Sequence, residues 1–477
     1  MSPVKVFMSD ELIKNSATEL AAMIRARKVS PVEVLESHLR RIERLNTNLN
    51  AIVTLAEDSM ERAREAQTAI MRGDELGPLH GVPFTVKDTI ETAGLRTTSG
   101  SSFRGSHIPD KDALAVARLK TAGAILLGKT NVPEMAIPYE CDNPLFGRTN
   151  NPHDLTKTSG GSSGGEAAAI SACLSPIGLG SDLSGSIRVP AHLCGIAGLK
   201  PTTGRVPTAG HFPQVTGAIS EGAVIGPMAR TIDDLSLLLN VLTEQPVTRL
   251  VSSQPERMRE SLRGWRVAVY WGEDYSPISV ETRNAIQEAL NALRQAGFII
   301  VDEATPGVGR LIDLWPALFS RASALQLKEA YSGHEEQAGK LARAVLASLK
   351  KVAPPAPNEL FRVRHEQFTL SNALIKWMQT TPLFIAPVGA VPAFEHGLRQ
   401  VDVEGKTISI FRAFGFSRLA NVVNLSSVSV PAGRTREGLP IGIQVLARGY
   451  QDEAALIAAS IIEDALGGGK ETMNYER

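Results

Sequence analysis

Residues 158–190 read TSGGSSGGEAAAISACLSPIGLGSDLSGSIRVP and contain two turns rich in glycine and serine. An apolar run that must cross a core separates the two turns. A Gly/Ser cluster alone is typical of a flexible linker, but the alanine-rich run from Glu166 to Leu174 follows the first turn at once and is predicted to be helical. The glycines therefore mark the ends of regular elements.

The second turn, residues 180–190, presents a serine in a setting suited to catalysis. It follows a short buried segment, Pro176 to Leu179, and Gly185 stands just before Ser186, so the predicted order is strand, tight turn, serine. Glycine lets the backbone approach a ligand closely, and successive amides in such a turn can hold negative charge. Ser186 is therefore a candidate nucleophile that needs a base from elsewhere in the chain. The neighbouring His192 fits a packed core residue better than that base.

Lys87 is the better candidate for the base. It lies in the apolar, strand-like run GVPFTVKDTI, residues 81–90, where a lysine needs either a task or a partner. On the lysine alone, a catalytic role and a salt bridge with Asp88 are equally good interpretations.

Three segments, HGVPFTVKDT, TSGGSSGGEAAA and GSDLSGSIRVP, resemble in order and spacing the three signature segments of the amidase signature family. The resemblance covers nearly the whole chain and is weakest in the first thirty residues and in residues 305–378. It implies that Ser186 forms the acyl-enzyme, that Ser162 relays the proton through a hydroxyl held on a cis peptide, and that Lys87 is the base. Neither a cofactor nor a metal is expected.

The resemblance also implies an oxyanion hole, built from the backbone amides of Leu183, Ser184, Gly185 and Ser186. The family usually has a second glycine where Ser184 stands. This serine either narrows the loop or offers a hydroxyl to the substrate, and both interpretations stay open.

Length and composition indicate a globular enzyme. A chain of 477 residues suggests about three domains by length alone, yet no linker interrupts it. We therefore expect a single domain over residues 1–477, with a signature core at about 75–235 and a helical cover at about 305–380. The 50 basic and 50 acidic residues cancel, so nothing electrostatic favours nucleic acid.

The cysteines and the apolar segments indicate in which cellular compartment the protein is expected. The three cysteines, Cys141, Cys173 and Cys194, lack metal-site spacing and are expected to be reduced core residues. No segment approaches the roughly eighteen apolar residues of a membrane span, and the amino terminus has no signal-like stretch. A cytoplasmic protein is expected, with a small-molecule substrate and no nucleic-acid or membrane partner. Family members often dimerise, so a homodimer is compatible with the resemblance.

Helical and strand-like segments alternate along the chain, which predicts an α/β fold: one large domain with a central mixed β-sheet covered by helices on both faces. A helix begins at Ser30 with Glu33 in a capping box. Further helices are predicted at 57–72, after Thr231, at 281–296, over most of 308–378 and at 452–465, and strands at 124–127, 266–271, 298–301, 383–387 and 439–446.

Two loops are candidates for the substrate pocket. Residues 130–149 form a proline-broken loop that looks most like the acyl-pocket loop of the fatty acid amide hydrolase branch, with Met135, Ala136 and Ile137 as pocket candidates. That these three side chains fill the core is an equally good interpretation. Residues 199–217 carry His211 and Phe212 and are expected to shape the leaving-group side.

Three functions were weighed. The first is a free-standing amide hydrolase that acts through an acyl-enzyme on small apolar or aryl substrates, and the same chemistry extends to esters and carbamates, including urethanes. The second is the glutamine-hydrolysing A subunit of a tRNA-dependent amidotransferase, which needs a polar pocket where this chain has apolar loops. The third, a phosphate-binding module, lacks any GxxxxGK[ST] or GxGxxG arrangement.

Overall fold

The computed structural model describes residues 9–137, 139–243, 255–351 and 354–467. Within these residues, eleven strands form one mixed sheet in the order β1-β3-β2-β6-β8-β7-β14-β15-β11-β9-β10. The strands are β1 (Ile52–Leu55), β2 (Pro83–Lys87), β3 (Ile125–Thr130), β6 (Ile177–Asp182), β7 (Ala197–Lys200), β8 (Val224–Ala229), β9 (Arg266–Val269), β10 (Ile299–Ile300), β11 (Leu383–Pro387), β14 (Ser426–Arg434) and β15 (Pro440–Ala447). The strands β3, β2 and β6 pair in parallel, as do β11, β9 and β10, and the strands between these two groups pair antiparallel. At one edge, β1 pairs antiparallel with β3.

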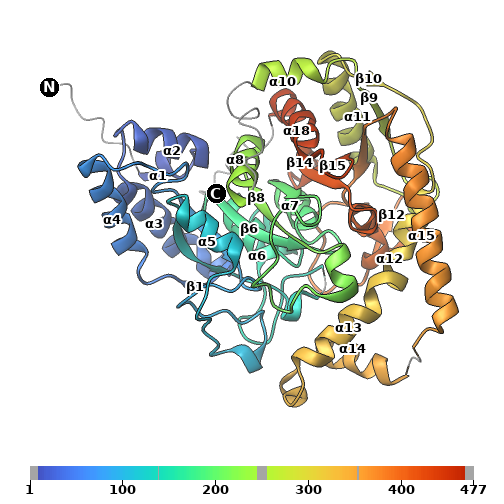
Figure 1. The fold of residues 1–477 in the computed structure, drawn as a ribbon, viewed down its shortest axis with the longest axis horizontal. Helices are drawn as coiled ribbons and strands as arrows, with labels where there is room; N and C mark the ends of the chain where they lie inside the picture. The colour runs from blue at the N-terminus through green and yellow to red at the C-terminus, as the bar shows by residue number, and fades with distance from the viewer. Residues whose placement is uncertain (1–8, 138, 244–254, 352–353, 468–477) are drawn as a thin grey trace.

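Helices surround the sheet (Figure 1). They are α1 (Ser9–Leu12), α2 (Ala17–Arg25), α3 (Pro31–Leu49), α4 (Ser59–Arg72), α5 (Leu114–Thr121), α6 (Gly164–Ser171), α7 (Arg188–Cys194), α8 (Ile232–Leu242), α10 (Pro255–Ser261), α11 (Val280–Gln295), α12 (Val308–Trp315), α13 (Arg321–Ala330), α14 (Lys340–Lys351), α15 (Pro357–Trp377), α16 (Ile410–Ala413), α17 (Leu419–Val422) and α18 (Asp452–Leu466). Figure 1 shows α2, α3 and α4 at one end of the molecule and α15 at the opposite end.

Both faces of the sheet are covered, which confirms the predicted fold class. Alternate side chains of β14 point to opposite faces: Val428 and Val430 join the main core with α11 and α18, whereas the Ser427 hydroxyl donates to Gln444 Oε1, which also accepts from Arg188 of α7. On the α7 side, α6 and α7 pack together over β6, β7 and β8. The chain is one large α/β domain.

Most predicted elements are confirmed, with shifts at their ends. The capping box at Ser30 and Glu33 starts α3, and residues 308–378 are almost wholly helical. The alanine-rich helix is shifted from the predicted 166–174: α6 spans Gly164–Ser171, so it begins two residues earlier and ends three residues earlier. It ends before the predicted position because Cys173 takes a left-handed conformation, with φ of 58°. The loop predicted from Leu199 begins only after β7.

All three cysteines are buried and form no disulfide. Within the described ranges, none of the helices combines the length and the apolar character that a membrane crossing requires.

Candidate active site

Lys87 ends β2 and its side chain is fully buried. Its Nζ lies 2.6 Å from Ser162 Oγ, 3.0 Å from Ser181 Oγ and 3.5 Å from the Ser181 carbonyl oxygen. Burial disfavours the ammonium form and lowers the pKa of Lys87 from 10.5 to about 7, against the opposing attraction of Asp182. A large fraction of this lysine is therefore neutral near pH 7 and can accept a proton.

Asp88 has other partners than Lys87. Its carboxylate accepts hydrogen bonds from the backbone N–H of Thr98, at 3.0 Å, and from the Thr98 hydroxyl. Among the residues that the structure describes, no ion pair joins Asp88 to Lys87. The salt bridge that the sequence left open is therefore not the reason for the buried lysine.

Ser162 and Ser186 reach the same cavity from two different turns. Ser162 precedes α6, and the Gly161–Ser162 peptide bond is cis, as the resemblance implies. Ser186 lies between β6 and α7. The N–H of Ser163 donates to the Ser186 carbonyl at 3.1 Å, which holds the two turns against each other. Ser186 is 9% exposed and Ser162 is 1% exposed, so Ser186 is the serine that a substrate reaches more readily.

A buried ion pair fixes the turn that carries Ser186. Asp182 binds the guanidinium of Arg188 at 3.0 and 3.1 Å, and both side chains are fully buried. Burial of Asp182 opposes ionisation, but Arg188 and the hydrogen bonds from Gly185 and Asn421 outweigh it and lower the pKa of Asp182 to about 2. Arg188 also donates to Gln444 of β15 at 2.9 Å. The turn is thereby anchored to a distant strand.

Glycine is required at position 185. Its φ is +104°, a conformation that L side chains rarely adopt, and an added Cβ would lie 2.5 Å from the Cβ of Ser417. This residue lets the chain reverse tightly just before Ser186.

The amides of this turn differ in what they contact. The N–H of Gly185 donates to Asp182 Oδ1 at 2.8 Å, so it points away from any oxyanion, unlike the sequence expectation. In the described part of the chain, the N–H groups of Leu183, Ser184 and Ser186 donate to no protein acceptor. These three amides are the ones that remain for a ligand.

Two side chains from outside the signature segments hold the carbonyls of the same turn. Trp315 Nε1 at the end of α12 donates to the Leu183 carbonyl at 2.8 Å, and the Tyr139 hydroxyl donates to the Ser184 carbonyl at 3.0 Å. Because a peptide unit is planar, fixing a carbonyl also fixes the N–H that follows it. Sequence analysis assigned neither residue, and no local pattern marks them.

The cavity beside the two serines has a volume of about 120 Å³. Met135, Ala136 and Ile137 all line it, and Met135 also belongs to a buried cluster with Leu327 and Tyr331, so this residue both lines the cavity and fills the core. Ser184 is not among the lining residues, so both interpretations of its hydroxyl stay open.

Phe212, predicted as a pocket residue, lies outside the lining. Its ring stacks under the Arg104 guanidinium, 3.7 Å from the ring centroid, and packs edge-on against Phe103. In this structure Phe212 therefore packs behind the cavity lining.

The far wall of the cavity comes from the helices between residues 305 and 380: α13 contributes Ser323, Gln326 and Leu327. The rest of the lining is mostly apolar and includes Leu183, Val215, Ile219, Ala223 and Val224. Among the described lining residues, Asp182 is the one acidic side chain and none is lysine or arginine. Because Arg188 already neutralises Asp182, the cavity presents an uncharged wall.

His211, which the sequence predicted only as part of a loop, also lines this cavity. Its Nε2 lies 2.9 Å from Ser181 Oγ, and its Nδ1 lies 2.8 Å from the Pro213 carbonyl oxygen. By contrast, His192 is a core residue as predicted: it is fully buried, and its ring contacts the backbone of Val391 and Gly442.

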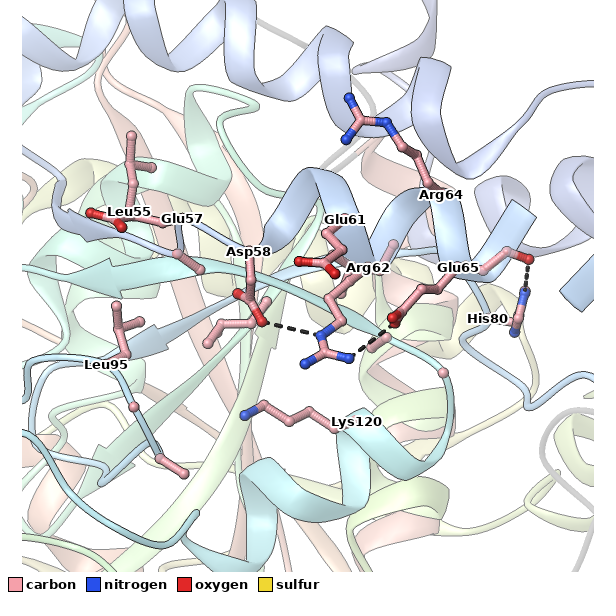
Figure 2. Close-up of a pocket in the computed structure, with 18 of the residues that line it drawn as sticks. Leu55, Glu57, Asp58, Glu61, Arg62, Arg64, Glu65, His80, Leu95 and Lys120 are labelled. Carbon is pink, nitrogen blue, oxygen red and sulfur yellow. Dashed lines mark hydrogen bonds and ion pairs between the residues drawn. The ribbon is translucent and has the colours of Figure 1, made fainter. Parts of the chain in front are cut away.

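A larger hollow of about 1390 Å³ lies elsewhere, between α4, α5 and the loop around Leu95 (Figure 2). Figure 2 shows Arg62 bound to Asp58 and Glu65 along α4, with Lys120 of α5 facing them. The charges of Arg62, Asp58 and Glu65 are exposed, and no serine or cysteine is among the lining residues that the structure describes. The hollow therefore lacks the serines that line the smaller cavity.

Comparison with known proteins agrees with this geometry. The Amidase family model matches residues 33–456. An acylamidase from Rhodococcus erythropolis is 32% identical over 462 residues, covering 94% of each chain. The A subunit of the glutamyl-tRNA(Gln) amidotransferase of Thermus thermophilus is 33% identical over 474 residues, covering 94% of this chain and 97% of its own. A solved bacterial aryl acylamidase of the amidase signature enzymes superposes with a TM-score of 0.82 at 25% identity, covering 94% of this chain and 96% of that one.

The fold and the site together define a hydrolase of amide bonds. The chain belongs to the amidase family, with the amidase signature, and it is an amidase.

Proposed function

We propose that the protein hydrolyses C–N amide bonds of small apolar or aryl substrates through an acyl-enzyme, with Ser186 as nucleophile, Ser162 as proton relay and Lys87 as base. Neutral Lys87 accepts the proton of Ser162, Ser162 accepts the proton of Ser186, and the Ser186 oxygen forms a bond to the substrate carbonyl carbon. Returning the proton along the same path to the leaving nitrogen allows the C–N bond to break. Water then attacks the acyl group and frees Ser186.

The hydrogen bond of 2.6 Å between Lys87 Nζ and Ser162 Oγ is the observation that carries this proposal. It joins a lysine with a lowered pKa to a hydroxyl that shares a cavity with Ser186. The hydroxyls of Ser162 and Ser186 are not hydrogen bonded to each other in the described structure, and such contacts often tighten only once substrate is bound.

The free amides of Leu183, Ser184 and Ser186 supply the proposed oxyanion hole. They stand on the turn that Asp182, Trp315 and Tyr139 hold. Donors that are already oriented stabilise developing negative charge without a cost of reorganisation at the moment of reaction. Gly185 contributes the turn geometry instead of a donor.

The lining of the cavity supports the substrate class. Its apolar wall favours an acyl or aryl group, because each buried methylene contributes about 0.8 kcal/mol. Esters and carbamates, including urethanes, pass through the same tetrahedral oxyanion, so we include them in the proposed range.

Glutamine hydrolysis is the competing function, because the amidotransferase A subunits are as similar as the acylamidase. Free glutamine carries an ammonium and a carboxylate, and burying either without an opposite charge is costly. The cavity offers no lysine or arginine for the carboxylate among its described lining residues. This observation supports a hydrolase of uncharged acyl groups.

The test is hydrolysis by the purified single chain of short and long acyl amides, arylamides, aryl carbamates and free glutamine, without nucleotide. Apolar substrates should exceed glutamine by at least about tenfold in kcat/KM, since two buried methylenes already supply that factor. Labelling with a fluorophosphonate should place the adduct on the Ser186 peptide, with Ser186→Ala as the matched control. Glutamine turnover equal to that of the apolar amides would favour the amidotransferase function, and labelling unchanged in Ser186→Ala would refute the nucleophile.

A further inference from the structure

A second chain of hydrogen bonds starts at Lys87 and ends at His211, and the mechanism above does not use it. Lys87 Nζ lies 3.0 Å from Ser181 Oγ, which lies 2.9 Å from His211 Nε2, and His211 Nδ1 lies 2.8 Å from the Pro213 carbonyl oxygen. Ser181 belongs to β6, whereas His211 comes from the loop after β7. Two segments thirty residues apart therefore meet at the lysine.

The donor and the acceptor of each hydrogen bond in this series follow from its last contact, between His211 Nδ1 and the Pro213 carbonyl oxygen. A carbonyl oxygen can only accept, so Nδ1 of His211 must carry a proton. Burial, together with the nearby Lys87 and Lys129, lowers the pKa of His211 to about 4, against the hydrogen bond to Pro213, so the ring is neutral near pH 7. Its Nε2 is then an acceptor, and the single proton of the Ser181 hydroxyl must point to it.

This direction determines what the Ser181 oxygen can do toward the lysine. With its proton committed to His211, Ser181 Oγ can only accept from Lys87. A neutral lysine has two N–H donors and one lone pair. The donors are used at the Ser181 hydroxyl and the Ser181 carbonyl, and the lone pair is left toward Ser162, 2.6 Å away.

We propose that His211 is a positioning residue that keeps the Ser181 hydroxyl an acceptor and so reserves the lone pair of Lys87 for the proton of Ser162. The inference rests on the proposed function, because it requires Lys87 to act as the base. Without the acceptor at Nε2, the Ser181 proton is free to turn toward the lone pair of Lys87 and compete with Ser162.

The test is a double-mutant cycle on His211 and Ser181. His211→Phe keeps a ring in the same space but removes the acceptor. It should lower kcat about tenfold, the value of one misdirected hydrogen bond, and change KM by less than about twofold. In a Ser181→Ala background the hydroxyl that could be misdirected is gone, so His211→Phe should then change kcat by less than about twofold.

His211→Gln is the matched control, because its amide oxygen can accept from Ser181. It should retain kcat within about threefold, and a folded Gln variant with a tenfold loss would contradict the inference even if the Phe variant does not fold. Additive losses in the cycle, or a rise in KM with unchanged kcat, would overturn it and reduce His211 to a wall of the cavity. Fluorophosphonate labelling separates the two proposals: no adduct on Ser186 in the wild type overturns the proposed function, whereas an adduct together with additive losses overturns only the role of His211.

Discussion

Replacing Lys87 with methionine should inactivate the enzyme and stabilise the fold at neutral pH. Moving the pKa of a buried lysine from 10.5 to about 7 costs about 5 kcal/mol, at about 1.4 kcal/mol per pKa unit. Methionine fills a similar space without that cost, but it loses the hydrogen bonds to Ser162 and Ser181. At about 1 kcal/mol for each bond, Lys87→Met should raise the free energy of unfolding by roughly 3 kcal/mol at pH 7.

The change of this stability difference with pH tests the lowered pKa of Lys87 more directly than its value at pH 7. Because the pKa of Lys87 is lowered in the folded state, the unfolded chain binds one more proton than the folded chain between about pH 7 and the ordinary lysine pKa. Wild-type stability from this group therefore rises with pH across that window, and the penalty is complete below it. The advantage of Lys87→Met should shrink by roughly 2 to 3 kcal/mol between pH 7.5 and 9.5.

Urea unfolding of the wild type and of Lys87→Met across this pH range measures the difference between their free energies of unfolding. The other titrating groups are the same in both proteins, so their contributions cancel in this difference. Lys111→Met is the matched control, since Lys111 is exposed and its ammonium stays in water on folding. A difference for Lys87→Met that stays constant with pH would mean that Lys87 is protonated in the fold at neutral pH. It could not then be the base.

Three further results are expected. The value of kcat/KM should rise with pH to a plateau, with a midpoint near pH 7, because the pKa of Lys87 is about 7. Lys87→Ala should abolish this rise and most of the rate. A variant with near wild-type activity and the same pH profile would show that the lysine has only a structural role. Arg188→Met should destabilise the fold by about 3 to 5 kcal/mol in urea unfolding, because Asp182 is left charged and buried, and a change under 1 kcal/mol would contradict that. Gly185→Ala should abolish fluorophosphonate labelling, because its Cβ would overlap Ser417; retained labelling would show that the turn adapts.

The local pattern of the signature segments was enough to predict the catalytic strand, the turn and the helix after it. Strand β2 is mostly apolar and wholly buried up to Lys87. The order of strand, turn and Ser186 at residues 177–186 follows from the glycines in and after the strand. These features depend on neighbours in sequence, so a single chain reveals them. The cavity position of Met135, Ala136 and Ile137 followed from the resemblance rather than from any periodicity.

Strands in the middle of the sheet were harder to predict. Strand β8, VIGPMA, contains a glycine and a proline, which sequence rules read as breaks, yet every residue in it is buried. Gly226 is needed because an added Cβ would lie 2.3 Å from the Leu199 carbonyl oxygen of the neighbouring strand. The close approach of these two backbones arises from the tertiary structure, so no local sequence pattern predicts it.

The side chains that hold the turn around Ser186 come from distant parts of the chain, which explains why the sequence indicated the proposed catalytic residues and not the residues that support them. Trp315 holds the Leu183 carbonyl across 132 positions, and Gln444 holds Arg188 across 256. Neither residue stands out in its own segment, since tryptophan on an apolar helix and glutamine in a strand have ordinary structural uses. Trp315 fixes the backbone near Ser186, and Gln444 fixes the arginine that binds Asp182 in the same turn. Short motifs can therefore predict candidates for a nucleophile and a base, whereas the close approach of Lys87 to Ser162 depends on contacts that form only when the chain folds.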